Sequence, residues 1–146
     1  MKLRKLNSHD RVGWDRLWLG YQQYYQVDID RQTTEHTWQK LLNDPLFGCF
    51  VIESDQGELA ALLHYTLHGH SWTQSPCCYL IDLYVDNNHR RHGHAKRLID
   101  HLIEEAKNNA WDRVYWLTKQ DNEQARKLYN QYAPVSDFVR YNVSIA

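Results

Sequence analysis

The sequence contains no apolar run approaching the roughly 18 residues that a membrane-spanning helix requires, so we expect no membrane segment. Its basic first residues, "MKLRKLNSHDR", lead into no apolar region, which argues against a signal peptide. No repeat, low-complexity stretch or linker interrupts the chain. These absences predict a single cytoplasmic domain over residues 1–146.

Cysteine is scarce, and positive and negative charges nearly balance. Cys49, Cys77 and Cys78 are odd in number and show no CxxC spacing, so we expect reduced thiols rather than disulfides or zinc ligands. The net charge of −1 provides no overall attraction to nucleic acid or to an anionic membrane. The basic run "HRRHGHAKR" (89–97) is soon followed by acidic residues, which disfavours a nucleic-acid patch.

Hydrophobic periodicity predicts alternating groups of strands and helices. Antiparallel hairpins come first and a βαβ crossover follows, so the predicted fold class is α/β, an α+β mixed sheet that is mostly antiparallel and flanked by helices. Asn7 or Ser8 is expected to cap the first helix, which contains Gly13 and Gly20 as sites of close approach or bending. Strands are expected at 2–6, 47–54, 58–70, 77–85, 113–118 and 137–145, and later helices at 34–43, 96–109 and 121–132.

The sequence "RRHGHA" (90–95) lies where a predicted strand passes into the most regular predicted helix. A glycine-containing turn before a helix is a general anion cradle, because the first N–H groups of the helix lack internal partners and the helix dipole favours negative charge. Gly93 permits a close approach of the backbone. Positive charge around the turn comes from Arg90, Arg91, Lys96 and Arg97. A tight turn with solvated basic residues is the alternative.

Three motifs in order carry a resemblance to a known family. The pattern Arg90-x-x-Gly93-x-Ala95 resembles the pyrophosphate loop, Q/R-x-x-G-x-G/A, of the GNAT acetyltransferases. The strand "YLIDLYV" (79–85) is similar to the family's central strand, and "NEQARKLY" (122–129) to its N-x-x-[AS]-x-x-[FL]-Y signature. Together these motifs cover residues 79–129. Longer stretches resemble the histone/polyamine acetyltransferase subgroup first described in yeast.

The resemblance implies the GNAT fold and an N-acetyltransferase that takes acetyl-CoA as co-substrate. It implies direct attack of a primary amine, such as a small amine, polyamine or amino compound, on acetyl-CoA in a ternary complex. A lysine acetyltransferase of the protein or histone type, and a non-catalytic acetyl-CoA-binding module, are the alternatives. Carried over by position, the resemblance implies that the pantetheine arm is held by Leu83, Tyr84 and Val85 and contacted by the motif that contains Asn122 and Ala125. It implies that the diphosphate loop consists of Arg90, Arg91, His92, Gly93, His94, Ala95 and Lys96. Tyr129 is then the residue that protonates the CoA sulfur.

The sequence departs from the family where a general base is expected. Relatives carry Glu before the strand Asp, whereas this chain has Ile81 followed by Asp82. Asp82 faces the opposite side of a regular strand unless a bulge re-aims it. Asp82 is therefore the candidate base, and water, His70 or binding of a neutral amine are alternatives. Tyr129 has a structural alternative as well, since an aromatic residue on one helix face is often part of a core.

Two sets of histidines are candidate metal ligands by their spacing, and no functional metal is expected from either. The sets are His64, His68 and His70, and His89, His92 and His94, and no carboxylate or cysteine completes them at a diagnostic spacing. The final segment 137–145 is apolar and rich in β-formers, so a homodimer or higher homo-oligomer is expected. A small primary amine is the expected acceptor, held by aromatic and acidic residues of the first two helices: Trp14, Trp18, Tyr21, Tyr24, Tyr25, Asp28, Asp30 and Glu35.

Overall fold

A computed structural model describes residues 1–146 of the protein. The chain divides into two compact units, residues 1–116 and 117–146. None of its helices combines the length and apolar character needed to cross a membrane. The elements are β1 (Lys2–Lys5), α1 (Arg11–Tyr25), α2 (Arg31–Asn43), β2 (Phe47–Glu53), β3 (Leu59–His68), β4 (Cys77–Val85), α3 (His94–Asn108), β5 (Arg113–Tyr115) and α4 (Glu123–Tyr129), with 3-10 turns at Ser8–Asp10 and Asn87–His89.

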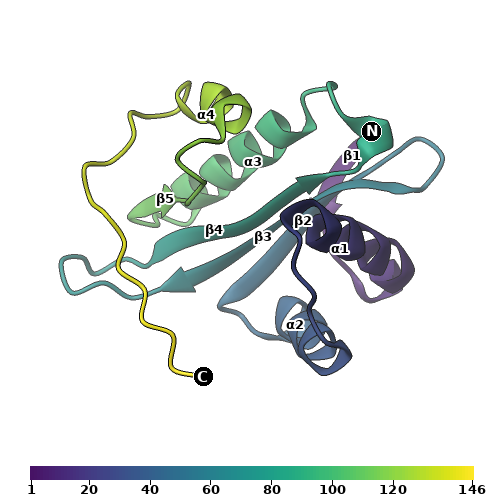
Figure 1. Ribbon diagram of the computed structural model, residues 1–146, viewed down its shortest axis with the longest axis horizontal. Helices are drawn as coiled ribbons and strands as arrows, with labels where there is room; N and C mark the ends of the chain where they lie inside the picture. Colours follow the sequence, from purple (N-terminus) through teal and green to yellow (C-terminus); the bar gives the residue numbers. More distant parts are fainter. The chain divides into compact units, whose positions relative to one another are not determined.

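The first unit is built on one sheet with strand order β1-β2-β3-β4-β5. The first three pairings are antiparallel, and β4 pairs with β5 in parallel through the α3 crossover. Helices α1 and α2 lie on one face of the sheet and α3 on the other (Figure 1). The predicted fold class, a mostly antiparallel mixed sheet flanked by helices, is therefore confirmed.

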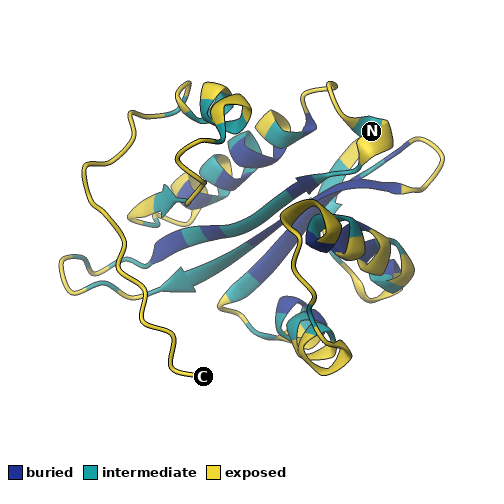
Figure 2. Cartoon of the chain, in the orientation of Figure 1, coloured by how far each residue is buried: buried dark blue, intermediate teal, exposed yellow.

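Both faces of the sheet are buried by helices. Val51 packs with Trp14, Trp18 and Trp38 in the core beneath α1 and α2, whereas Phe50, one residue earlier on β2, meets His101 of α3 edge to face. Neighbouring residues of a strand point to opposite faces, so β2 contributes to both cores. Figure 2 shows this as continuous burial along β2 and the first half of β3.

Local signals explain where α1 begins and how closely it packs. The side chain of Asn7 accepts from His9 N–H at 2.9 Å, and Asp10 Oδ2 accepts from Asn7 N–H at 2.8 Å. Asn7 therefore caps the 3-10 turn Ser8–Asp10 that leads into α1, whereas the N-cap of α1 itself is Asp10, which makes no side-chain capping bond. A Cβ at Gly20 would lie only 2.5 Å from Tyr84 Oη. Glycine at position 20 thus allows α1 to lie directly against β4, which is the close approach predicted from the sequence.

Two predicted strands are wrong or too long. The segment 113–118 forms a strand only over Arg113–Tyr115, and the segment 137–145 has no regular structure. Phe138, Tyr141 and Ile145 are strongly exposed, at 83%, 91% and 91%. An alternating apolar pattern becomes a strand only where another strand supplies hydrogen-bond partners, and residues 137–145 pair with no strand of this chain. Other boundaries move by one to three residues, because Asp30 rather than a later residue caps α2 and Asn122 caps a shorter α4.

The ion pairs at the start of α1 generate a prediction about pH. Arg4 donates to both oxygens of Asp10, at 2.8 and 2.9 Å, and also to Glu53. Burial by itself would raise the pKa of Asp10, but the hydrogen bonds from Arg4 and Asn7 outweigh burial and lower that pKa. A lowered pKa stabilises the fold above the unfolded value of about 3.9, and this stabilisation is lost as the pH falls through the folded value.

We expect Asp10→Asn to lower the free energy of unfolding by about 1–3 kcal/mol at pH 7, because one charged partner of Arg4 disappears. The difference from the wild type should shrink as the pH falls below the unfolded value of about 3.9 and through the lowered folded value, where Asp10 itself becomes protonated. Urea unfolding at several pH values measures both effects. A difference that stays constant down to pH 2 would contradict the assigned role of the Asp10 carboxylate.

Candidate active site

A register shift in β4 determines which side chains reach the α1/α2 face of the sheet. His64 on β3 pairs with Asp82, but the next residue, Tyr65, pairs with Leu80, so Ile81 is an extra residue in β4. Such a β-bulge interrupts the alternation of side chains. Ile81 and Asp82 both line one small cavity beneath α1 and α2. The sequence predicts that Asp82 can reach the site only if β4 contains a bulge, and this bulge is present.

Asp82 is held by a buried chain of hydrogen bonds that begins in α1. Trp14 Nε1–H donates to His64 Nε2 at 3.0 Å, and His64 Nδ1 lies 3.0 Å from Asp82 Oδ2. Indole can only donate, so Nε2 of His64 must be the acceptor and Nδ1 must carry the proton. Trp14 and His64 are almost completely buried, at 0% and 1% exposure. The geometry fixes His64 as a neutral donor to the Asp82 carboxylate.

Tyr21 is a second donor to the same carboxylate. Burial, followed by the negative charge of Asp82 and a side-chain hydrogen bond to it, raises the pKa of Tyr21 far above its ordinary value. Tyr21 therefore remains protonated and donates its hydroxyl hydrogen to Asp82. It also stacks on Trp18, with ring centroids 4.7 Å apart. Asp82 is thus positioned by neutral donors from α1 and β3, with no guanidinium or ammonium among the groups bonded to it.

The cavity that Asp82 lines has a volume of about 150 Å³. A larger depression of about 550 Å³ lies near the end of α2, but no residue of β4 lines it. Thr37, Lys40 and Leu41 share one face of α2 by their spacing. The cavity is lined by Trp18, Thr37, Lys40, Leu41, Phe47, His64, Ile81 and Asp82.

The other aromatic and acidic residues expected around the acceptor have different positions. Trp14 is part of the core, and Tyr24 and Tyr25 are exposed. Asp30 caps α2 by accepting from Thr33 N–H at 2.6 Å, and Glu35 pairs with Arg11 at 2.5 Å. The structure therefore assigns Asp30 and Glu35 to the stability of α1 and α2. Asp28 lies on the exposed connection before α2.

The segment between β4 and α3 forms a strongly turned loop. Arg91 and Gly93 have φ of 66° and 75°, and Gly93 is the N-cap of α3. A Cβ at Gly93 would meet no atom within 4 Å, so the space above this residue is open. The first intrahelical bond runs from Arg97 N–H to Gly93 O at 3.0 Å. The N–H groups at the start of α3 therefore lack acceptors within the helix, as an anion cradle requires.

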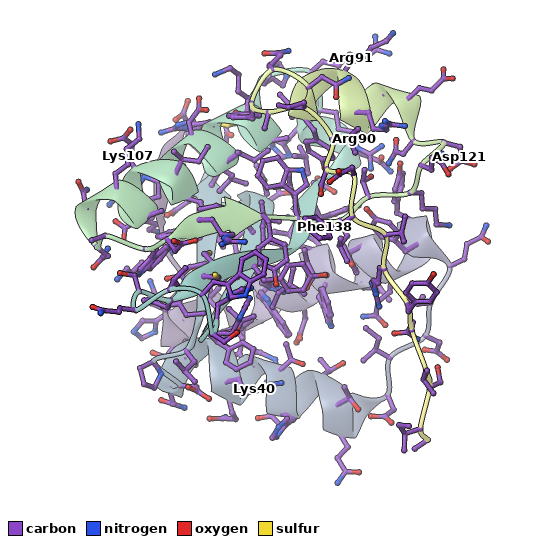
Figure 3. All side chains as sticks on the ribbon, turned by 90° about the vertical axis from the view of Figure 1, so that its left-hand side faces the viewer. Lys40, Arg90, Arg91, Lys107, Asp121 and Phe138 are labelled. Carbon is purple, nitrogen blue, oxygen red and sulfur yellow. The ribbon has the colours of Figure 1, made fainter.

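The sequence predicts that the cationic side chains of this loop surround the turn, but two of them are engaged elsewhere. Arg90 turns back, donates to Val85 O at 3.1 Å and lies over the rings of Tyr24 and Tyr84. Lys96 pairs with Asp100 at 2.7 Å. Arg91 is exposed on the loop, and both arginines are labelled in Figure 3. Of these three cations only Lys96 is paired with a carboxylate, whereas Arg90 keeps its charge but directs its guanidinium back toward Val85 and the two rings.

Beside this loop, β4 has an unpaired edge. β5 pairs with β4 only at Cys77, Cys78 and Tyr79, and the register extends no further. Residues 80–85 of β4, which include Leu83, Tyr84 and Val85, therefore have a strand partner only on the β3 side. Backbone N–H and C=O groups along such an edge can bind an extended ligand. The predicted pantetheine-binding residues lie on this edge.

The second unit contains the remaining predicted residues on α4. Asn122 is the N-cap, and its side-chain oxygen accepts from Ala125 N–H at 3.3 Å. Capping leaves the amide NH₂ of Asn122 available as a donor, which is the group a ligand carbonyl would need. Tyr129 is the last helical residue and is half-buried.

Two of the histidines from the candidate metal-binding sets have other partners. His68 Nε2 lies 2.8 Å from Tyr115 Oη, and His70 Nδ1 accepts from Trp72 N–H. A different group, Glu58, Asp86 and His89, brings its ligand atoms within 4.8 Å of one another. Arg16 pairs with both of those carboxylates, at 3.3 and 3.4 Å, and thus already supplies a cation.

Comparison with known proteins identifies relatives across almost the whole chain. The sequence model of the Acetyltransferase (GNAT) family matches residues 14–133. The D-amino-acid N-acetyltransferase HPA3 of Saccharomyces cerevisiae is 28% identical over 142 residues, which are 95% of this chain and 88% of the yeast protein.

Solved structures show the same fold at lower identity. A ribosomal-protein-alanine N-acetyltransferase from Brucella melitensis biovar Abortus 2308 superposes with a TM-score of 0.81 at 24% identity, covering 99% of this chain and 100% of that one. An aminoglycoside acetyltransferase from an uncultured soil metagenomic sample gives a TM-score of 0.83 at 22% identity, covering 99% and 96%. These similarities support the fold alone.

The Trp14–His64–Asp82 chain generates a prediction about stability. His64→Leu removes the acceptor of a buried indole N–H and a donor to Asp82, so the free energy of unfolding should fall by about 1–3 kcal/mol. Adding Trp14→Phe removes the unpaired donor, and the two changes should therefore be less than additive by about 0.5–3 kcal/mol. Urea unfolding of the two single variants and the double variant measures the coupling. Strict additivity would show that the hydrogen bond between Trp14 and His64 contributes nothing.

Proposed function

The chain belongs to the Acetyltransferase (GNAT) family and is therefore an acetyltransferase, and we propose that it transfers the acetyl group of acetyl-CoA to a small primary amine. The observation that carries this proposal is the arrangement of β4. Its bulge brings Asp82 into a cavity, and the strand leads directly toward the Arg90–Ala95 loop at the start of α3. One strand thus presents a carboxylate for an ammonium and an anion cradle for a diphosphate.

Acetyl-CoA is proposed to bind along β4 and the loop after it. The open edge at Leu83, Tyr84 and Val85 suits the amides of the pantetheine arm, which can extend a sheet by main-chain hydrogen bonds. The positive φ of Gly93 and the open space above it suit a diphosphate at the start of α3. Backbone N–H groups from residues 91–96 are the proposed donors, and Asn122 is the proposed further contact to the pantetheine arm.

The proposed reaction is direct attack by the amine on the thioester. The ammonium of the acceptor first loses a proton to Asp82, directly or through water, and its nitrogen then bonds to the acetyl carbon. The carbon–sulfur bond breaks, the CoA thiolate takes a proton from the Tyr129 hydroxyl, and the second proton that the amine nitrogen loses restores this hydroxyl through solvent. Ile81 cannot act as a base, so the neutral donors His64 and Tyr21 matter because they hold Asp82 in place while leaving its negative charge unneutralised.

A small acceptor is favoured over a protein lysine. The cavity of about 150 Å³ is about five times the 30 Å³ that a water molecule occupies in the liquid, which suits a compact molecule. The name of the yeast relative adds amino acids to the acceptors worth testing. A peptide substrate would need an extended groove beside Asp82, and the cavity lined by Asp82 is small and bounded by α1 and α2.

A homo-oligomer, a dimer or larger, is proposed from the exposed C-terminal segment. Phe138, Val139, Tyr141, Val143 and Ile145 expose between 77% and 91% of their surface, as part of an unpaired apolar stretch. Such a segment is covered most simply by a second copy of the chain. We expect light scattering at micromolar concentration to give at least twice the mass of 17.5 kDa, and removal of residues 137–146 to lower it. A monomeric mass for the full chain would contradict this.

The function itself is tested by thiol release from acetyl-CoA with polyamines, amino acids, aminoglycosides and a histone-tail peptide as acceptors. We expect turnover with at least one small amine. Tyr129→Phe should lower kcat by about 10²- to 10⁴-fold with little change in the KM for acetyl-CoA, because it removes the general acid while keeping the ring.

Tyr132→Phe, three residues beyond α4, provides a matched control for the loss of a tyrosine hydroxyl. Wild-type turnover in Tyr129→Phe would make Tyr129 a packing residue. Activity on the peptide alone would favour a protein lysine acetyltransferase, and no activity on any acceptor would favour a non-catalytic acetyl-CoA-binding module.

A further inference from the structure

The cavity that contains Asp82 also contains a group of opposite charge. Lys40 extends from α2 into the lining of the same cavity and is labelled in Figure 3. Its Nζ lies 4.8 Å from the centroid of the Phe47 ring, which also lines the cavity. A half-buried ammonium over an aromatic face is held in a defined place, but a ring does not neutralise its charge. Lys40 forms no ion pair with a carboxylate of this chain.

Trp18 supplies a second donor that lacks a partner. Its side chain lines the cavity and is only 6% exposed, yet the buried Nε1–H has no hydrogen-bond partner in the structure. Buried donors in native proteins are nearly always paired, so an unpaired one on a residue that lines a cavity is a candidate donor to a molecule bound there. Indole cannot accept a hydrogen bond, and the missing partner must therefore be an oxygen or another acceptor.

Taken together, the lining groups favour a ligand that carries an ammonium at one end and an anionic oxygen at the other. Asp82 attracts an ammonium, whereas Lys40 and Trp18 offer one charged and one neutral donor to an anionic oxygen. A polyamine would place a second positive charge near Lys40, and a lysine within a peptide has no free carboxylate of its own. A small amino acid carries both required groups within a few bonds and matches the size of the cavity.

We propose that Lys40 and Trp18 form a carboxylate-binding subsite and that the acceptor is a small zwitterionic amino acid, with its ammonium at Asp82 and its carboxylate at Lys40 and Trp18. This rests on the proposed function, because it takes the Asp82 end of the cavity as the place where the reacting amine binds. Lys40 and Trp18 are specificity residues in this arrangement and take no part in proton transfer. Leu41, Phe47 and Ile81 form the apolar wall for the side chain of the amino acid.

The decisive experiment compares acceptors that differ only in the carboxylate. Thiol release is measured with saturating acetyl-CoA and with alanine of either configuration, alaninamide or spermidine as acceptor. The wild type should prefer alanine to alaninamide, which keeps the amine and the methyl group but loses the negative charge. Lys40→Met should lower kcat/KM for alanine by about ten- to a hundredfold, mainly through KM, and change the value for alaninamide by less than about threefold.

Two further variants separate charge from packing. Lys40→Arg keeps a positive charge and should retain most of the activity on alanine, and Trp18→Phe keeps a ring but loses the donor and should weaken alanine selectively. Lys107→Met is the matched control, because Lys107 is an exposed lysine of α3 paired with Glu104 and should be replaceable without effect. Equal losses on alanine and alaninamide in Lys40→Met, or a wild-type preference for alaninamide or spermidine, would overturn the proposal.

Failure of the proposed function can be told apart from failure of the subsite. One outcome is that the wild type shows no thiol release with any of the acceptors tested. In that case, calorimetric titration of alanine into the wild type and into Lys40→Met tests the subsite without turnover. Binding of alanine that is lost in Lys40→Met supports the subsite even though acetyl transfer has failed. Absence of binding to the wild type, or equal binding to both proteins, overturns it.

Discussion

Ile81 gives β4 one residue more than β3 can pair with, and the position of Asp82 follows from that mismatch. In a regular strand Ile81 and Asp82 would point to opposite faces of the sheet. The bulge instead puts Asp82 opposite His64, which Trp14 orients by a hydrogen bond, and Tyr21 is the second donor to the carboxylate. All of these donors are neutral. An arginine in the same place would hold the carboxylate equally well but would remove the charge that attracts an ammonium.

The same strand organises both halves of the candidate site. Its middle carries Asp82 beneath α1, its free edge carries Leu83 to Val85, and its end leads through Asn87–His89 to the loop before α3. Placing these groups on one central strand fixes their separations more firmly than placing them on loops would. Gly20 contributes to the packing of α1 on β4, because a side chain there would require the Tyr84 ring to move.

Several parts of the molecule could be predicted from the sequence because the signals are local. The strand at 77–85 was predicted with its observed bounds, and the apolar stripe of α3 and the cap at Asn7 are read from spacing alone. The glycine of "RRHGHA" and its position before a helix indicate a tight turn, and Gly93 has a positive φ. The final segment 137–145 shows the limit of such signals, because its alternating pattern describes a strand that has no partner in this chain.

By itself, then, the sequence determined the order of the elements from β1 to α4, the family and the glycine-containing loop before α3, since each of these depends on residues close together along the chain. Only the tertiary structure decided what surrounds Asp82. His64 and Asp82 are 18 residues apart, and Trp14 and His64 are 50 apart, so their contacts depend on sheet register and on the docking of α1. Lys40 gave no signal of its own for the same reason: a lysine on a helix acquires a role only when packing places it in a cavity with an opposite charge.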